Sequence, residues 1–303
     1  MIDAIKQITG TLVLMLMLSG VSHAGSVGMG RLADITFEQG DPGKLKAVFG
    51  YDINWTPAEI TTLSLWLDAD DSDTVTIVDG GVSAWADKSG DDNDFTQTTA
   101  SKRPSYTAEE YVSFGTNDLL THSVNGDILT ATNGSVIVVA KGSSNVRNTD
   151  LSMFYNRRIW SATSYQGVYI TSGGYVGFQA VTATGYHSAE KADWGAEWNI
   201  VHAYNDGGDA GITVGITNTA TTTIGVSSGF ADGVFALGWH YQDNVAYYFG
   251  GYSTGYIREV IASKTKFTTD ELQSLEGYLA WKWDMTASLP ADHPYKTKAP
   301  QKE

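Results

Sequence analysis

The sequence has no cysteine and few charged residues, and most of its charges have one sign. The absence of Cys among 303 residues excludes a disulfide framework, a thiol nucleophile and a Cys-ligated zinc site. Charged residues make up 17% of the chain, below the usual value of about 25%. The 34 acidic residues outnumber the 19 basic ones, for a net charge of −15. This acidity argues against nucleic acid and anionic membrane surfaces as partners, and suits an extracellular or cation-binding protein.

The remaining composition indicates a folded β-protein. Hydrophobic residues make up 42% of the chain, which excludes disorder over its whole length. Glycine is enriched, at 33 residues, and aromatic residues reach 12%. Together with long stretches of Thr, Ser and Val, these values favour strands joined by many tight turns.

The N-terminal segment resembles a secretory signal peptide. Residues 11–21 form an apolar run after Lys6, and Ser22-His23-Ala24 follows as a small-x-small cleavage pattern. The run is too short for an ordinary membrane span. Two alternatives remain open: cleavage after Ala24, which gives an extracellular protein, and retention of residues 1–24 in an assembly or a bilayer. Membrane contact is expected only through this segment, if it is retained.

The pattern along the chain predicts an arm or linker over residues 25–58, a large β-domain over 59–290 and a C-terminal tail over 291–303. One short strand is expected around residues 47–51. Many short runs punctuated by Gly, Asn, Asp and Ser are typical of an all-β fold, here an antiparallel two-sheet jelly-roll sandwich. The expected strands cover residues 63–67, 82–86, 135–141, 167–171, 175–181, 199–204, 211–217, 221–226, 235–240, 246–250 and 256–262.

One helix is expected, over residues 269–283, packed on the sandwich. Thr268 is a suitable N-cap, and Glu271 completes a capping box. Four apolar residues fall on one helical face: Leu272, Leu275, Leu279 and Trp283.

Two segments resemble the LamG-like, concanavalin A-like jelly-roll superfamily, in the form found in phage and marine bacterial surface proteins. The first is Leu65-Trp66-Leu67-Asp68-Ala69-Asp70, followed by Val82–Gly90 and Asn93-Asp94-Phe95. The second is Gly255–Ile261, followed by Glu276–Trp283 and His293-Pro294-Tyr295. The resemblance covers residues 59–296. It implies a jelly roll, but it leaves function open, because such folds host lectins, hydrolases, lyases and structural modules.

Aspartates cluster between residues 68 and 94. Hard oxygen ligands at alternate loop positions bind calcium, so one hypothesis is a calcium site formed by Asp68, Asp70, Asp71, Asp73 and Asp87. The alternative is that these side chains hydrogen-bond their own backbone in tight turns, in which case Asp87→Asn is expected to cost little. In the resembled family, aspartates recur at the positions that match Asp68 and Asp87. The resemblance therefore implies that these two side chains either hydrogen-bond within their loops or ligate a metal.

Catalytic patterns are weak. The paired carboxylates of jelly-roll glucanases have no counterpart, and the nearest set, Glu190, Asp193 and Glu197, is interpreted as a solvated polar loop. Glu259 lies on an expected strand. The resemblance implies a structural role for this residue, because the matching position in the family is structural. The six histidines lack zinc-ligand spacing. We therefore predict a protein that is not an enzyme.

Aromatic residues are dense between residues 239 and 256. Exposed rings stack on sugars, so Trp239, Tyr241, Tyr248 and Tyr252 are predicted to bind glycan, although most of these aromatics could instead fill the core. The predicted function is a non-catalytic surface module of an extracellular assembly, foremost a phage virion component. Its expected partners are a glycan or neighbouring virion subunits, in a homo-oligomer. The alternatives are a secreted bacterial glycan-binding protein and a glycan-degrading enzyme.

Overall fold

The structure is a computed structural model. It describes residues 35–38, 46–49, 55–115, 118–122, 128–130, 133–142, 151–158, 165–170, 175–182, 185–192, 197–216, 218–223, 233–238 and 255–302. The chain divides into two compact units, residues 1–51 and 52–303. The apolar segment over residues 1–24 lies outside the described residues, as does most of the predicted arm over 25–58.

In the first unit, β1 (Ile35–Glu38) pairs antiparallel with β2 (Lys46–Phe49). The strand expected around residues 47–51 corresponds to β2, and β1 was not expected.

The second unit contains an eight-stranded antiparallel sheet. Its order is β17-β16-β15-β10-β19-β8-β7, and β3 also pairs with β19. Its strands are β3 (Leu63–Asp68), β7 (Ser105–Thr107), β8 (Tyr111–Phe114), β10 (Asn133–Gly142), β15 (Asn199–Asp206), β16 (Asp209–Val214), β17 (Asn218–Thr223) and β19 (Gly255–Ser263).

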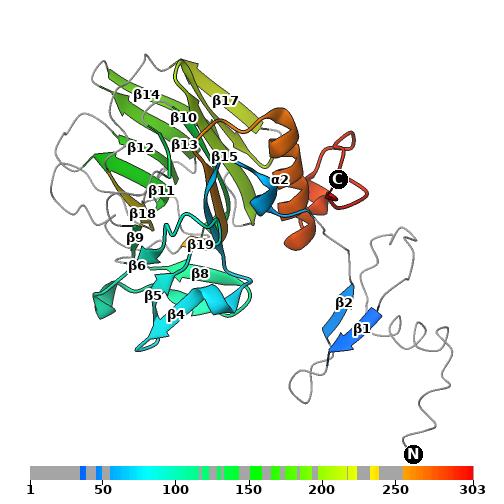
Figure 1. Cartoon of the computed structure of the whole chain (residues 1–303). Coiled ribbons are helices and arrows are strands. Elements are labelled where there is room, and N and C mark those ends of the chain that lie inside the picture. The colour runs from blue at the N-terminus through cyan, green and yellow to red at the C-terminus, as the bar shows by residue number, and fades with distance from the viewer. Residues whose placement is uncertain are drawn as a thin grey trace, which may run out of the picture. The chain divides into compact units, whose positions relative to one another are not determined.

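A nine-stranded antiparallel sheet packs beside it (Figure 1). Its order is β14-β13-β12-β11-β18-β9-β6-β5-β4. Its strands are β4 (Val75–Val78), β5 (Gly81–Trp85), β6 (Phe95–Thr96), β9 (Leu120–His122), β11 (Leu151–Arg158), β12 (Tyr165–Ile170), β13 (Tyr175–Thr182), β14 (Gly185–Ala192) and β18 (Gly233–Leu237). The two sheets confirm the predicted all-β sandwich.

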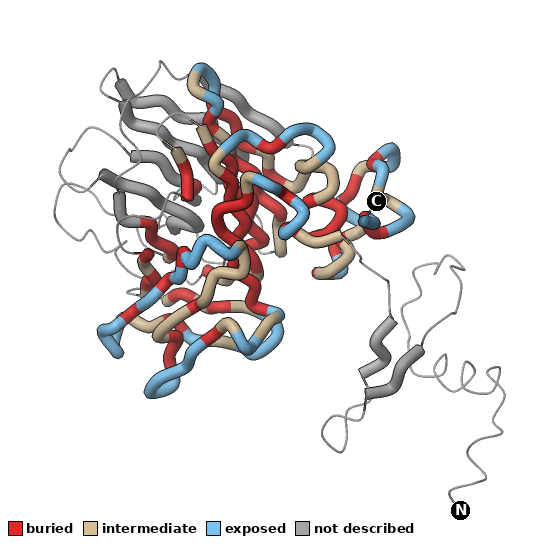
Figure 2. Tube along the Cα trace, viewed as in Figure 1, coloured by how far each residue is buried: buried red, intermediate tan, exposed pale blue. Residues whose placement is uncertain are grey.

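The central strands of the eight-stranded sheet are buried on both faces. On β10, Val136 and Val138 point into the core between the sheets, whereas Ile137 and Val139 point to the outer face and pack under the helix. A strand that is covered on both faces has a nearly continuous run of apolar residues. This explains why polar and apolar residues alternate so little along β10. Figure 2 shows the buried residues concentrated in these strands.

The helix α2 (Thr269–Lys282) covers the outer face of the eight-stranded sheet (Figure 1). The Thr268 side chain accepts from the Glu271 amide, and the Glu271 carboxylate accepts from the Thr268 amide, so the predicted capping box is confirmed. Its buried residues include Leu275 and Leu279. Three-residue 3-10 turns lie at Pro57–Glu59, Ser72–Thr74, Ala100–Lys102 and Thr286–Ser288. Within the described ranges, no helix has the length and apolar character needed to cross a membrane.

The chain after α2 lies against the helix. The Tyr295 side chain fills the space above Gly277, where an added Cβ would lie 2.6 Å from the Tyr295 Cβ. The Trp281 indole donates to the Tyr295 carbonyl at 2.8 Å. Beside them, the His293 Nε2 lies 3.2 Å from the Glu276 carboxylate, and both side chains are buried. Burial raises the pKa of Glu276 to about 7 and lowers that of His293.

Candidate functional site

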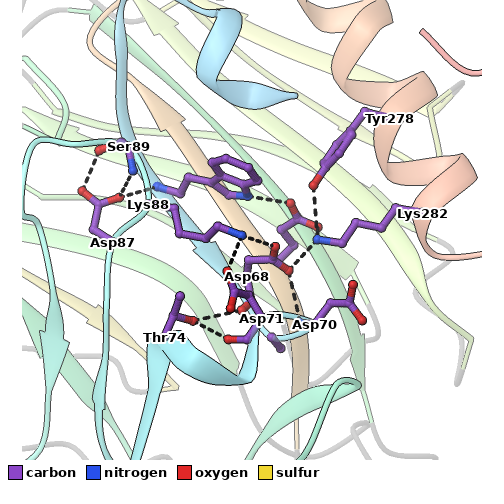
Figure 3. Close-up of polar contacts among 12 residues, drawn as sticks. Asp68, Asp70, Asp71, Thr74, Asp87, Lys88, Ser89, Tyr278 and Lys282 are labelled. Carbon is purple, nitrogen blue, oxygen red and sulfur yellow. Dashed lines mark hydrogen bonds and ion pairs between the residues drawn. The ribbon is translucent and has the colours of Figure 1, made fainter. Parts of the chain in front are cut away.

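A buried ion-pair network joins α2 to the edge of the sandwich core (Figure 3). Asp68, at the end of β3, accepts from the ammonium groups of Lys282 and Lys88. The Lys282 Nζ also lies 3.1 Å from Glu259, and the Lys88 Nζ lies 2.8 Å from Asp71. The network therefore places three carboxylates around two ammonium groups.

Glu259 is the most deeply buried member, with no exposed surface. Its two oxygens accept from the indole N–H groups of Trp66 at 2.8 Å and Trp283 at 2.7 Å. Burial raises the pKa of Glu259, although Lys282 opposes this shift. Burial would also raise the pKa of Asp68, but its ion pairs with Lys282 and Lys88 outweigh that effect and lower it. The network holds α2 on the sheet.

Asp87, by contrast, ties its own loop together. One oxygen accepts from the amides of Trp66 and Ser89, both at 2.8 Å. The other accepts from the Ser89 hydroxyl at 2.6 Å and the Asn93 amide at 3.0 Å. An Asn side chain has one carbonyl oxygen in place of these two acceptors. The structure therefore leads to a different expectation for Asp87→Asn, namely a clear loss of stability.

The predicted calcium ligands do not gather around one point. Asp68 is paired with ammonium groups and Asp87 with amides, while Asp70 and Asp73 are exposed. Across the part of the chain that the structure describes, no group of three or more His, Asp or Glu side chains is placed to hold a metal ion. Because these carboxylates bind ammonium groups and backbone amides, the arrangement favours the turn-forming alternative. Calcium binding here stays a prediction without structural support.

A β-bulge on β19 places two consecutive side chains on the outer face of the eight-stranded sheet. Val139 of β10 pairs with Glu259, but the next residue, Ala140, pairs with Ile257, so Arg258 is the extra residue. Ile257 and Val260 both point into the core between the sheets. Because a bulge redirects side chains, Arg258 and Glu259 both contact residues on the helix-covered side.

Next to the bulge, the outer face carries a cluster of half-buried aromatic and basic side chains. We call it the Trp198 patch, and it consists of Tyr111, Lys141, Trp198, Tyr256 and Arg258. Four of these residues come from β8, β10 and β19, and Trp198 directly precedes β15. On each of these three strands, the neighbouring residue points into the core, which leaves the patch residue on the outer face.

Tyr256 contacts Tyr111 and Trp198 edge to face, and the rings of Tyr111 and Trp198 are tilted by 45° to each other. The centroids of Tyr111 and Tyr256 are 5.1 Å apart, those of Tyr111 and Trp198 are 5.8 Å apart, and those of Trp198 and Tyr256 are 6.4 Å apart. Such contacts hold aromatic rings in fixed orientations. The three rings therefore form one preorganised surface.

The two basic side chains of the patch contact ring faces. The Arg258 guanidinium carbon lies 4.0 Å from the Trp198 ring centroid and 4.9 Å from that of Trp283. The Lys141 Nζ lies 5.9 Å from the Trp198 centroid. Neither cation has a carboxylate within ion-pair distance among the described residues. The Arg258 Nε is buried without a hydrogen-bond partner, and burial lowers the pKa of Arg258, with Glu110 opposing this shift.

The residues predicted to bind glycan, Trp239, Tyr241, Tyr248 and Tyr252, lie outside the described residues. Tyr256 ends the same aromatic-rich stretch and belongs to the Trp198 patch. Sequence reasoning missed Tyr111 and Trp198, because the strand pairings that bring them to Tyr256 join residues more than fifty positions apart. A single sequence carries no local signal for such a contact.

One expectation about the acidic residues was wrong. Glu190 does not lie in a loop, because β14 extends to Ala192 and Glu190 pairs with Gly177 of β13. Glu197 is exposed, and Asp193 lies outside the described residues. Hydrogen bonding to β13 places this polar segment in a strand, although its composition suggests a loop. Glu259 lies on β19, as expected.

Comparisons with known proteins give a fold but no family. No family model matches the chain. No curated protein matches its sequence. The structure is similar to the botulinum neurotoxin serotype D binding domain, at 12% identity and a TM-score of 0.50, covering 70% of this chain and 50% of that chain. It is also similar to the binding domain of botulinum neurotoxin DC in complex with SialylT, at 12% identity and a TM-score of 0.52, covering 73% and 52%.

A third similar structure comes from work titled "Cell entry of botulinum neurotoxin type C is dependent upon interaction with two ganglioside molecules", at 10% identity and a TM-score of 0.50, covering 76% and 52%. The chain thus spans about half the length of these structures. At such identities the similarity shows a shared β-sandwich fold. The LamG-like resemblance stays a prediction beyond that fold.

Proposed function

We propose that this protein is a non-catalytic glycan-binding module and that sugar rings bind on the Trp198 patch. The observation that carries the proposal is the preorganised set of three rings on the outer face of the eight-stranded sheet. Half-buried Tyr and Trp side chains present an apolar face and a hydrogen-bonding edge, and a sugar ring presents both as well. Arg258 and Lys141 add donors for its oxygens.

Two of the similar structures add support for this class of ligand. One was solved with SialylT, and the other concerns a toxin whose cell entry depends on ganglioside molecules. The first is a binding domain, which agrees with a protein that is not an enzyme. The role as a virion component, the homo-oligomer and the extracellular location stay predictions.

A binding panel tests the proposal. Purified protein is titrated against neutral polysaccharides, a β-glucan and a galactan, and acidic ones, alginate and chondroitin sulfate. The Trp198→Ala variant should lose affinity by about tenfold or more, as expected for a buried aromatic contact at a binding site. Trp55→Ala is the matched control, because Trp55 contacts Tyr278 of α2 instead, with ring centroids 6.1 Å apart.

Two outcomes would overturn the proposal: no binding anywhere in the panel, or binding that Trp198→Ala leaves unchanged. Release of reducing ends is measured in parallel. Sustained turnover would favour the alternative of a glycan-degrading enzyme.

A further inference from the structure

Arg258 stands apart from most other basic side chains that the structure describes. Lys88, Arg103, Lys264, Lys266, Lys282 and Lys302 each have a carboxylate partner within 3.5 Å. Among the described residues, the Arg258 guanidinium contacts ring faces and has no carboxylate within ion-pair distance, and Glu110 acts on it only at longer range. The chain carries 34 acidic residues. In so acidic a protein, a guanidinium without a carboxylate partner is unusual.

The surroundings of the Arg258 guanidinium supply aromatic rings in place of a carboxylate. Its central carbon lies over the Trp198 ring, 4.0 Å from the centroid, and 4.9 Å from the centroid of Trp283. The N–H groups of arginine form a planar fork that matches the two oxygens of a carboxylate or sulfate. The Nε of this fork is buried and has no hydrogen-bond partner in the described part of the chain.

We infer that the ligand of the Trp198 patch is an acidic sugar, with Arg258 binding its carboxylate or sulfate group. This inference rests on the proposed function and narrows its ligand class. Lys141, whose Nζ lies 5.9 Å from the Trp198 ring centroid, adds a second positive charge to the same surface. The rings hold the sugar, and the two cations select for its charge.

Because the chain as a whole is strongly acidic, the attraction for an acidic sugar must come from the Trp198 patch itself. A protein with a net charge of −15 repels polyanions in general. Binding of an acidic glycan therefore requires a specific positive site, and nonspecific attraction cannot account for it. For the same reason, loss of a single cation at the patch should have a large effect on acidic ligands.

The experiment compares acidic with neutral ligands. Wild-type protein and Arg258→Gln are titrated with alginate, which carries carboxylates, chondroitin sulfate, which carries both groups, and a neutral galactan. Arg258→Lys retains the charge without the planar fork, and circular dichroism checks that each variant folds. Lys302→Gln is the charge-matched control, because Lys302 pairs with Glu59 and neither residue belongs to the patch.

We expect wild type to prefer an acidic polysaccharide, and Arg258→Gln to lose about tenfold or more in affinity for it, as for a lost charge-assisted pair. Arg258→Lys should retain only part of the wild-type affinity for the acidic polysaccharide. Lys302→Gln should bind it as wild type does. A preference for alginate identifies the carboxylate, and a preference for chondroitin sulfate identifies the sulfate.

Equal affinity for neutral and acidic ligands, or wild-type affinity in Arg258→Gln, would overturn the inference. If Trp198→Ala still abolished binding in that case, the proposed function would stand. If Trp198→Ala had no effect either, both would fail.

Discussion

Replacing Lys282 with Met should destabilise the larger unit more than any change to an exposed ion pair. The variant removes the ammonium group that links Asp68 and Glu259 but leaves the aliphatic part of the side chain. Glu259 has no exposed surface, and the indole groups that still donate to it are neutral. Asp68 retains its pair with Lys88 at 2.9 Å.

The magnitude follows from which charge is left without a partner. Removing one partner of a buried ion pair costs about 3–5 kcal/mol, because an uncompensated charge remains in the interior. Since Lys88 still neutralises Asp68, we expect the low end, about 3 kcal/mol of unfolding free energy. For a unit of this size, that corresponds to a fall in Tm of about 6–12 °C.

Urea denaturation followed by circular dichroism measures the effect, with the m-value as a check on two-state unfolding. Lys264→Met is the control, because Lys264 and Asp91 form a pair in which each side chain is 38% exposed. It should cost less than about 1 kcal/mol. The Lys282→Met deficit should shrink at low pH, where Glu259 becomes protonated. A cost below about 1 kcal/mol, or a deficit that does not depend on pH, would refute the reasoning.

Four further predictions follow from the described contacts. Glu276 has its pKa raised to about 7, so the folded state loses stability as pH rises from 4.5 to 7; Glu276→Gln should remove this decline, at most about 3 kcal/mol, in unfolding experiments across that range. Asp87→Asn should cost about 1–3 kcal/mol in urea melts, since its oxygens accept four hydrogen bonds. Millimolar Ca²⁺ and EDTA should leave the Tm unchanged; a rise with Ca²⁺ would support the calcium hypothesis for Asp68, Asp70, Asp71, Asp73 and Asp87. Gly277→Ala should weaken the contact with Tyr295, because the added Cβ lies 2.6 Å from the Tyr295 Cβ, and limited proteolysis should then cleave the C-terminal segment faster.

The elements that sequence reasoning predicted well are those with local signals. Thr268 and Glu271 stand three residues apart, and the capping box forms as expected. Strands with continuous apolar runs, such as β3 and β10, were also predicted, because burial on both faces requires such runs.

Elements without a local signal were missed. Three of the four β4 residues are exposed, so that strand lacks the alternation that marks a half-buried strand. β14 is polar, and its pairing with β13 determines its structure. The bulge at Arg258 depends on its register with β10, which no property of residues 255–263 reveals. The ion-pair network was equally hidden, because Asp68 and Lys282 are 214 residues apart in the chain.

Hydrogen–deuterium exchange with mass spectrometry tests the central claim, sugar binding on the Trp198 patch, most directly. Exchange is measured with and without an oligosaccharide prepared from the polysaccharide that binds best in the panel. We predict protection in peptides that cover Tyr111–Phe114, residues 197–200 and residues 255–258, with no change at β4 and β5. Protection confined to other parts of the chain, with these three segments unchanged at saturating ligand, would contradict the account.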